Sequence, residues 1–270
     1  WLYELRLFGS KLGLKNPRQL AAHAGNPHGQ LNVIHVAGTN GKGSVCAMLE
    51  SIYRRAGYKT GLFTSPHLVS FRERIQVNRK LVVEENVVRL TECMQALLRH
   101  FPVNQPPTFF EVITVMALEE FAREKCDVVI LETGLGGRLD ATNIVTPIAS
   151  VITSIALDHQ QHLGETVAEI AAEKAGIIKP RVPVFSPAHQ PEINEIIRKV
   201  AAQHKSQLEF VETEIATCLL GKHQRQNAAL AQATVRALQD IFPVDDQCIN
   251  DGLANVHWAG RAQCYEKKNQ

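Results

Sequence analysis

The sequence lacks the features that would place it in a membrane or export it. Aromatic residues make up 6% of its 270 residues. None of its apolar runs approaches the roughly 20 residues that a transmembrane helix needs, and its first residues do not form a signal-peptide pattern. We therefore expect a cytoplasmic protein with no membrane partner.

Paired cysteines are also absent. The six cysteines are scattered along the chain, and no two of them form a Cys-x-x-Cys motif. This spacing argues against a zinc ribbon and against a dense disulfide scaffold. We expect reduced thiols that serve mainly as structural residues.

Neither sign of charge dominates. The chain has 29 basic and 27 acidic residues, which gives a formal net charge of +2, and no basic stripe interrupts their even distribution. Proteins that bind nucleic acid usually show such a stripe. We expect no nucleic-acid partner.

What the sequence does contain is an alternation of strand and helix patterns. Short β-branched apolar runs predict buried strands at residues 33–37, 61–64, 128–132, 149–153 and 182–185. Helical patterns cover residues 45–56, 84–100, 110–124, 167–175, 192–204 and 227–241, and the segment 110–124 reads as strongly amphipathic. This order predicts an α/β fold with a mainly parallel sheet and helices on both faces. Ligands of such sheets gather at the carboxyl ends of the strands.

A phosphate-binding loop follows the first predicted strand. Backbone amides of a glycine-rich turn, a lysine and the start of a helix together attract phosphate oxygens. Its spacing differs from the common P-loop, because Val36 stands where the first glycine belongs and Gly43 separates the lysine from the serine. A turn that merely closes the strand is the alternative. The candidate nucleotide-binding residues are Gly38, Thr39, Asn40, Gly41, Lys42, Gly43 and Ser44.

Polar side chains also follow the next strand. The turn at residues 64–68 presents Ser65 and His67 toward the phosphate loop, and Arg72 and Arg74 further on are suited to an anionic substrate. A solvated charged loop would have the same composition. Both interpretations stay open on these residues alone.

Glu132 ends the strand at residues 128–132, and the glycine-rich stretch 134–137 comes directly after it. A carboxylate at the end of a strand beside a phosphate loop commonly holds Mg²⁺. The glycines let the backbone approach a ligand closely, and Asp140 and Asn143 offer polar groups beyond them. The alternative is a surface glycine loop that is capped by Asp140.

Four further residues are candidates with plainer alternatives. His159 could complete a metal shell with Asp158 as its orienting partner, although most of the eleven histidines must be structural. Lys174 could simply be a favourable cation at a helix C-terminus. Asn227 suits an adenine edge and Arg261 suits phosphate charge, but either could cap or solvate a helix end.

Taken together, the motifs resemble those of bacterial folylpolyglutamate synthases, which are often bifunctional with dihydrofolate synthase and are related to the ATP-dependent muramyl ligases. The resemblance runs from about residue 7 to residue 261 and rests on the motifs at residues 35–44, 64–67, 132–143 and 173–179 in this order. It implies that ATP phosphorylates a carboxylate of a folate or dihydropteroate and that the amine of L-glutamate attacks the resulting acyl phosphate.

The resemblance also implies a role for each candidate. Ser65 and Glu132 would bind one Mg²⁺, Glu132 and His159 a second, and Lys174 would be carbamylated and contribute oxygen ligands. ATP would contact the phosphate loop, Asn227 and Arg261, and Asp140 would lie in a region that helps bind the pterin substrate in bifunctional members. With Arg74, which is suited to an anionic substrate, Asp140 is the candidate substrate-binding residue. The residues expected to take part in catalysis are Lys42, His159 and Lys174.

The resemblance has consequences for domain organisation. We expect residues 1–261 to form an ATP-binding ligase domain and residues 262–270 to begin a linker to a second, Rossmann-like domain that these 270 residues do not contain. The interval between Phe210 and Leu219 is shorter than the family leads us to expect. A monomeric ligase is the leading hypothesis, and a nucleotide-responsive binding module and a small-molecule kinase are the alternatives.

Overall fold

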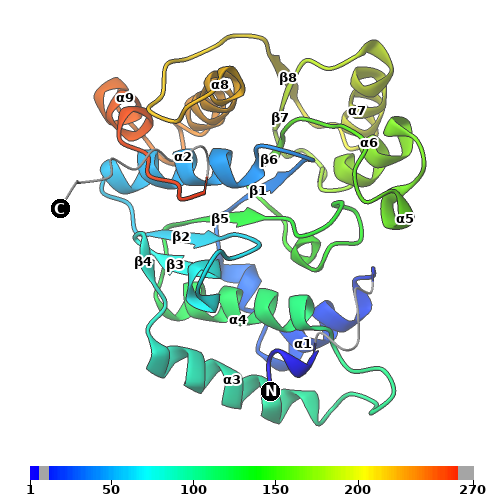
Figure 1. The fold of residues 1–270 in the computed structure, drawn as a ribbon. Coiled ribbons are helices and arrows are strands. Elements are labelled where there is room, and N and C mark those ends of the chain that lie inside the picture. The colour runs from blue at the N-terminus through cyan, green and yellow to red at the C-terminus, as the bar shows by residue number, and fades with distance from the viewer. Residues whose placement is uncertain (6–11, 261–270) are drawn as a thin grey trace, which may run out of the picture.

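The protein is represented by a computed structural model that describes residues 1–5 and 12–260. Its centre is one sheet with the strand order β4-β3-β2-β5-β1-β6-β7-β8 (Figure 1). The strands are β1 (Val33–Ala37), β2 (Thr60–Phe63), β3 (Ile75–Val77), β4 (Lys80–Leu81), β5 (Val128–Glu132), β6 (Ala149–Ile152), β7 (Val184–Pro187) and β8 (Leu208–Val211). All pairings from β2 to β8 are parallel, whereas β3 and β4 form an antiparallel edge. The expected mainly parallel α/β sheet is confirmed.

The helices cover both faces of this sheet. They are α1 (Lys15–His23), α2 (Lys42–Arg55), α3 (Glu84–Leu98), α4 (Phe109–Arg123), α5 (Gln160–Leu163), α6 (Val167–Ala175), α7 (Pro191–Gln203), α8 (Lys222–Ala237) and α9 (Asp246–Ala254), with 3₁₀ turns η2 (Pro27–Gln30), η3 (Phe71–Arg74) and η4 (Ala141–Ile144). Because side chains alternate along a strand, Ile34 and Val36 face the core beneath α2, α8 and α9, while Val33 faces the core beneath α1, α3 and α4. Helices α6 and α7 pack beside this second core, near β6 and β7.

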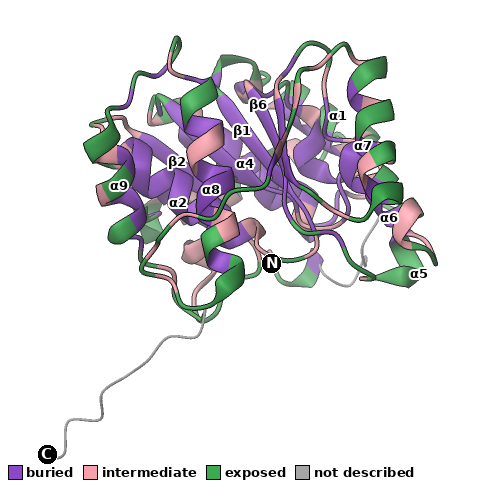
Figure 2. Ribbon diagram, turned by 90° about the horizontal axis from the view of Figure 1, so that it is seen from above, coloured by how far each residue is buried: buried purple, intermediate pink, exposed green. Residues whose placement is uncertain are grey.

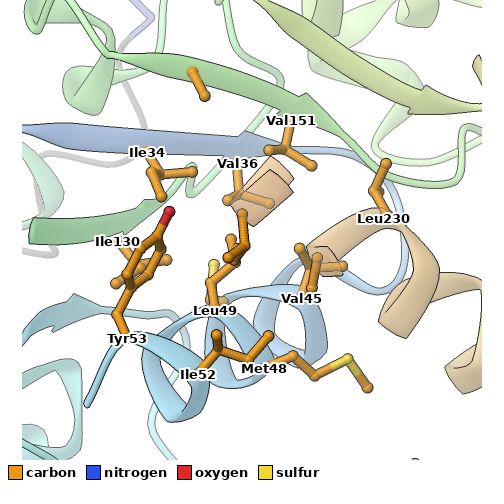
Figure 3. Close-up of a cluster of buried hydrophobic side chains, with 14 of the residues drawn as sticks. Ile34, Val36, Val45, Met48, Leu49, Ile52, Tyr53, Ile130, Val151 and Leu230 are labelled. Carbon is orange, nitrogen blue, oxygen red and sulfur yellow. The ribbon is translucent and has the colours of Figure 1, made fainter. Parts of the chain in front are cut away.

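The core beneath α2 fixes the base of the phosphate loop. Figure 3 shows side chains of the helix, among them Val45, Leu49 and Tyr53, pointing at β1 and its neighbours. The inner strands of the sheet and the inner sides of the helices are buried, whereas the edge strand β4 and the outer sides of helices such as α7 and α9 are exposed (Figure 2). A loop between β1 and α2 is therefore held at both ends by rigid, buried elements.

Several boundaries differ from those that the sequence predicted. Helix α2 begins at Lys42 rather than at residue 45, and α8 spans Lys222–Ala237 rather than residues 227–241. Helices α1, α5 and α9 and strands β3, β4 and β8 were not predicted, because each is short and carries little periodic signal.

The prediction of an amphipathic segment at residues 110–124 is wrong. In α4, 11 of the 15 residues are buried. The sheet covers one side of this helix, while α3 and α1 cover much of the rest (Figure 1). A helix enclosed in this way is apolar on nearly all sides.

The structure bears on the expected state of the cysteines and on the expected lack of membrane-spanning helices. The five cysteines in the described part of the chain are all free, as expected of reduced thiols, and Cys264 lies outside it. Within the described residues, none of the helices combines the length and apolarity that crossing a bilayer requires.

Candidate active site

The phosphate loop leaves β1 and turns directly into α2. Gly41 adopts a left-handed conformation with φ of +91° and is the N-cap of the helix. A side chain there would also collide with Asn227, whose Oδ1 would lie 2.7 Å from the added Cβ. The left-handed conformation favours glycine at this position, and a larger residue would also have to displace the Asn227 side chain. The loop thus leads directly into the N-terminus of α2, which is where the motif predicts an anion site.

Hydrogen bonds tie this loop to the end of β6. The Thr39 amide donates to the Ser154 carbonyl at 2.7 Å, and the hydroxyl of Thr153 donates to the Asn40 carbonyl at 2.8 Å. The Ser154 hydroxyl donates to the same Asn40 carbonyl at 3.0 Å. Because the carbonyls are occupied in this way, the loop is held in place before any ligand binds.

Lys42 is the first residue of α2 and folds back over the loop. Its Nζ donates to the Gly38 carbonyl at 2.9 Å and to the Thr39 carbonyl at 3.1 Å. The ammonium therefore lies against the loop that a phosphate would occupy. This is the position that the role predicted for Lys42 requires.

Ser65 and Glu132 lie together at the ends of β2 and β5. The Ser65 amide donates to Glu132 Oε2 at 2.9 Å, and Glu132 is only 3% exposed. In the sheet, Glu132 is aligned with Val36, two residues before the phosphate loop begins. The structure thus brings the first predicted metal pair next to the loop.

A cavity of about 330 Å³ opens beside this pair. Leu12, Phe110, Leu135 and Leu139 supply apolar wall, and Ser65, Arg74, Thr108, Glu111, Asp140 and His159 supply polar groups. Arg74 is buried, donates from Nε to His67 Nδ1 at 2.7 Å and lies over the Phe109 ring. Arg72 is engaged elsewhere, with the Val82 carbonyl and Glu84. Arg74 is therefore the arginine of this turn that borders the cavity.

Asp140 closes the glycine loop as well as bordering the cavity. Its carboxylate accepts hydrogen bonds from the amides of Gly134, Leu135 and Thr142 at 2.8–3.0 Å. Burial raises its pKa, and these donors oppose that change. The structural role that the sequence left open is thus present, and it coexists with a place in the cavity wall.

His35 extends this network into the sheet. The Thr142 hydroxyl donates to Asp140 and can therefore accept from His35 Nε2, which lies 2.8 Å away. His35 is fully buried, and desolvation, with a smaller contribution from Lys179, lowers its pKa to about 3. The neutral imidazole of His35 thus holds the Thr142 hydroxyl in the orientation in which it donates to Asp140. The sequence analysis missed this role, although a histidine inside an apolar strand is a signal for it.

His159 is the least constrained of the predicted metal ligands. It is exposed, adopts a left-handed conformation with φ of +46°, and places Nε2 3.6 Å from Asp158 Oδ1. It borders the 330 Å³ cavity, as Ser65 does, whereas Glu132 borders a second cavity of about 450 Å³ that Ser65 also lines. Among the described residues, no group of three or more His, Cys, Asp or Glu side chains is gathered around one point. A site with two metal ions therefore stays a prediction.

Lys174 lies in the interior and not at an exposed helix end. It is 2% exposed, and no described residue forms a hydrogen bond or an ion pair with its ammonium. Burial, with a further contribution from Lys42, lowers its pKa to about 8, against the opposing charges of Asp158 and Asp140. A solvated cation at a helix C-terminus does not describe this residue.

The turn that carries Lys174 is locked to the glycine loop. The Arg138 amide donates to the Glu173 carbonyl at 2.7 Å, and the Arg138 side chain pairs with Glu173 Oε1 at 2.6 Å. The Asn143 amide group donates to the carbonyls of Arg138 and Gly176 at 2.9 and 3.0 Å. Two motifs whose bonded residues are 33 to 35 positions apart in sequence thus form one structural unit.

Asn227 borders a third cavity, of about 420 Å³, together with Asn40, Gly41, Ser44, Ser154, Pro187, His223 and Gln224. Its Nδ2 donates to Gln224 Oε1 at 3.0 Å, and its Oδ1 faces Gly41. The structure therefore places Asn227 beside the phosphate loop, although within α8 rather than at its start. Arg261 lies outside the described residues.

Comparison with known proteins identifies the family. Residues 36–210 match the model of the Mur ligase middle domain. The chain is 39% identical over 298 aligned positions to a dihydrofolate synthase/folylpolyglutamate synthase of Bacillus subtilis, an alignment that covers 99% of this chain and 69% of the relative. The chain belongs to the folylpolyglutamate and dihydrofolate synthase family. These proteins are ATP-dependent ligases that add glutamate to folates.

Solved structures of the family share the fold. The Thermotoga maritima folylpolyglutamate synthase has a TM-score of 0.89 at 35% identity, with 98% of this chain and 67% of that chain covered. The E. coli FolC protein in complex with DHPP and ADP also has a TM-score of 0.89, at 36% identity, with 99% and 68% covered. The resemblance drawn from the motifs is confirmed.

The alignment also shows that the relative is longer. The chain spans 69% of the B. subtilis protein, and the 298 aligned positions exceed the 270 residues of this chain. The relative therefore carries internal segments without a counterpart here.

Proposed function

We propose that this chain provides the nucleotide site and the pterin site of an ATP-dependent ligase that joins L-glutamate to a folate or to dihydropteroate through an acyl phosphate. One observation carries the proposal: two cavities lie at the same edge of the sheet, on either side of the phosphate loop. The 330 Å³ cavity borders the ends of β2 and β5, and the 420 Å³ cavity borders the ends of β1, β6 and β7. Glu132 accepts from the amide of Ser65, which lines the first cavity, and Lys42 follows Gly41, which lines the second.

ATP fits the cavity that Asn227 borders. Its phosphates would lie on the loop amides and Lys42, and its base would lie toward α8, where Asn227 and Gln224 offer donors and acceptors. The ADP complex of the E. coli FolC protein supports nucleotide binding in this family. Arg261 is proposed as a further nucleotide contact from the motif alone.

A pterin carboxylate fits the other cavity. Apolar and aromatic side chains such as Phe110 and Leu135 suit a flat ring, and Asp140 and Thr108 suit its polar edge. Arg74 is the buried cation of this cavity and suits the carboxylate. The DHPP complex of the E. coli FolC protein supports a ligand of this kind.

Ser65 and Glu132 are suited to hold Mg²⁺ beside the phosphates, because a hydroxyl and a buried carboxylate are oxygen donors of the kind that this ion prefers. Magnesium would neutralise charge on the γ-phosphate. His159 and a carbamylated Lys174 are proposed as ligands of a second ion.

Carbamylation of Lys174 would resolve an unfavourable arrangement in this chain. The ammonium of Lys174 is buried without a described hydrogen-bond partner and is repelled by the charge of Lys42. Its pKa is therefore lowered, and a larger fraction of Lys174 is present as the free amine. The free amine can add carbon dioxide and become an anion that Lys42 attracts. Nuclear magnetic resonance with ¹³C-bicarbonate would show a carbamate signal that is absent from Lys174→Ala.

The reaction then follows from position. A carboxylate oxygen of the pterin substrate attacks the γ-phosphorus of ATP, the bond to the β–γ bridging oxygen breaks, and ADP leaves. The amine of glutamate attacks the acyl carbon, loses a proton and displaces phosphate. Lys42 stabilises the phosphate charge in the first step, and Arg74 orients the attacking carboxylate.

Binding measurements test both sites on the 270 residues. Calorimetry should detect AMPPCP with Mg²⁺ and, separately, dihydropteroate. Glu132→Gln should weaken the Mg²⁺-dependent part of AMPPCP binding and spare dihydropteroate, while Arg74→Gln should do the reverse. Equal losses of both ligands in either variant would contradict the assignment of two sites.

The oligomeric state and the cellular location do not follow from the geometry of the site. We propose a monomer, which light scattering coupled to gel filtration would check by a mass near 29.9 kDa. The cytoplasmic location expected from the sequence stays a prediction.

A further inference from the structure

Trp258 lies against the first turn of α2. A Cβ added to Gly43 would come within 2.9 Å of Trp258 Cζ2 and 3.3 Å of its Cε2 and Nε1. The indole edge therefore touches the backbone of the helix at its second residue. This contact accounts for the departure from the common P-loop, because only glycine leaves room for the indole between Lys42 and Ser44.

Arg79 holds the other side of the indole. Its guanidinium carbon lies 5.0 Å from the Trp258 ring centroid, and its Nη2 donates to the His257 carbonyl. Asn78 and Arg79, the turn between β3 and β4, are both left-handed, with φ of +49° and +65°. The hairpin thus presents Arg79 to the segment that follows α9.

Trp258 makes no polar contact that would explain its place. Its Nε1 is buried without a hydrogen-bond partner in the described structure, and its ring packs against the core that α2 shares with α8 and α9. The indole is therefore held by shape and by the cation above it. Its contact surface is the helix turn whose amides would receive phosphate.

We propose that Trp258 is a positioning residue for the phosphate loop, held by Arg79 against Gly43, so that nucleotide affinity depends on a side chain that lines the 450 Å³ cavity beside Ser65 and Glu132 and touches the first turn of α2. The inference rests on the proposed nucleotide site. Helix N-terminal amides bind phosphate only when their directions converge, so a shift of this turn weakens binding.

A double-mutant cycle tests the contact. AMPPCP binding with Mg²⁺ is measured by calorimetry for the unsubstituted chain, Gly43→Ala, Trp258→Ala and the double variant. We expect about tenfold weaker binding for Gly43→Ala, equal to about 1.4 kcal/mol, and little further loss when Gly43→Ala is added to Trp258→Ala. If the loss of AMPPCP affinity in the double variant equals the product of the losses in the two single variants, the inference is overturned.

Arg79 has a matched control elsewhere in the chain. Arg198 also lies 5.0 Å from an aromatic centroid, that of Phe210. Arg79→Ala should weaken AMPPCP binding several-fold, whereas Arg198→Ala should leave it unchanged. Equal effects of the two variants would show that loss of such a pair acts only through general stability.

Tryptophan fluorescence distinguishes a positioning role of Trp258 from a purely structural one, because only a positioning role predicts that its emission responds to nucleotide. The chain has two tryptophans, so Trp1→Phe leaves Trp258 as the only one. Its emission should change when AMPPCP binds, and Gly43→Ala should shift it without nucleotide. Circular dichroism and urea midpoints establish that each variant is folded.

The outcomes separate the two proposals. If the unsubstituted chain binds no AMPPCP, the proposed nucleotide site and this inference both fail. If the unsubstituted chain binds AMPPCP and Trp258→Ala binds it with the same affinity, only the inference fails.

Discussion

At the scale of single residues, Lys174 shows how far the environment can depart from the local sequence. Its helix reads as a short alanine-rich segment that ends in a cation, yet the side chain is 2% exposed. Burial of an ammonium without a partner is costly, and proteins retain such groups mainly at functional sites. The environment of Lys174 therefore supports a role in chemistry.

Lys42→Ala should remove most nucleotide affinity and leave the fold intact. A charged hydrogen-bond partner contributes about 1.5–3 kcal/mol, so AMPPCP should bind roughly ten- to hundredfold more weakly. Calorimetry measures the affinity, and circular dichroism checks the fold. Lys59→Ala, which removes a lysine that pairs with Glu124 away from the loop, is the control. Unchanged affinity in Lys42→Ala would contradict the assignment.

His35 should make the protein sensitive to acid. Burial lowers the pKa of His35 to about 3 from an ordinary value of 6.5. Between these pH values the unfolded chain binds a proton that the folded chain does not, so the free energy of unfolding falls as the pH is lowered. His35→Gln should flatten this dependence in urea titrations from pH 6.5 downward. The exposed variant His100→Gln should keep it, and a parallel slope in His35→Gln would refute the account.

At the scale of elements, helix ends and loops set the position of the site. Helix α6 begins with a capping box, in which Thr166 Oγ1 accepts from the Glu169 amide and Glu169 accepts from the Thr166 amide. Its other end is bonded to the glycine loop through Arg138 and Asn143. Because both ends of α6 are fixed, so is the turn that carries Lys174.

Thr166→Ala should destabilise the protein without changing nucleotide binding. Loss of an N-cap side chain costs about 1 kcal/mol. The urea midpoint should fall accordingly, while AMPPCP affinity at 25 °C stays the same. Thr166→Ser, which keeps the hydroxyl, should restore the midpoint; a failure to do so would mean that the cap is not the cause.

At the scale of the whole molecule, strand order decides which motifs meet. The ends of β2, β5, β1 and β6 are neighbours in the sheet, although β5 follows β2 by more than 60 residues. Ser65, Glu132 and the phosphate loop therefore share one edge. The cavities at this edge, on either side of the phosphate loop, would suit the two substrates of the proposed ligase.

The 270 residues should bind Mg-AMPPCP yet form no glutamyl amide. These residues span 69% of the B. subtilis relative, and we propose that the part of the relative beyond them contributes to its glutamate site. Positioning can contribute roughly 7–11 kcal/mol to a reaction between two molecules, and an unpositioned amine would lose it. Mass spectrometry after incubation with ATP, Mg²⁺, tetrahydrofolate and labelled glutamate checks this. Robust product from these residues alone would contradict the prediction.

Much of the fold was readable from local pattern. The strands at residues 33–37 and 128–132 and the helix at residues 167–175 were predicted with the boundaries that the structure has. Buried strands carry continuous apolar runs, and helices end at glycine or proline. Each of these signals is contained in a few consecutive residues, so it can be recognised without the tertiary structure. The short strands β3 and β4 and the enclosure of α4 were missed, since neither has a local signature.

The sequence by itself determined the order of strands, turns and helices and the chemistry of the motifs, because side-chain periodicity and turn residues act over short distances. Only the tertiary structure decided that Lys174 is buried, that Asn143 locks its turn to the glycine loop, and that Trp258 rests on Gly43. These contacts join segments that are 33 to more than 200 residues apart. They depend on strand order and on helix packing across the sheet, which no local pattern encodes.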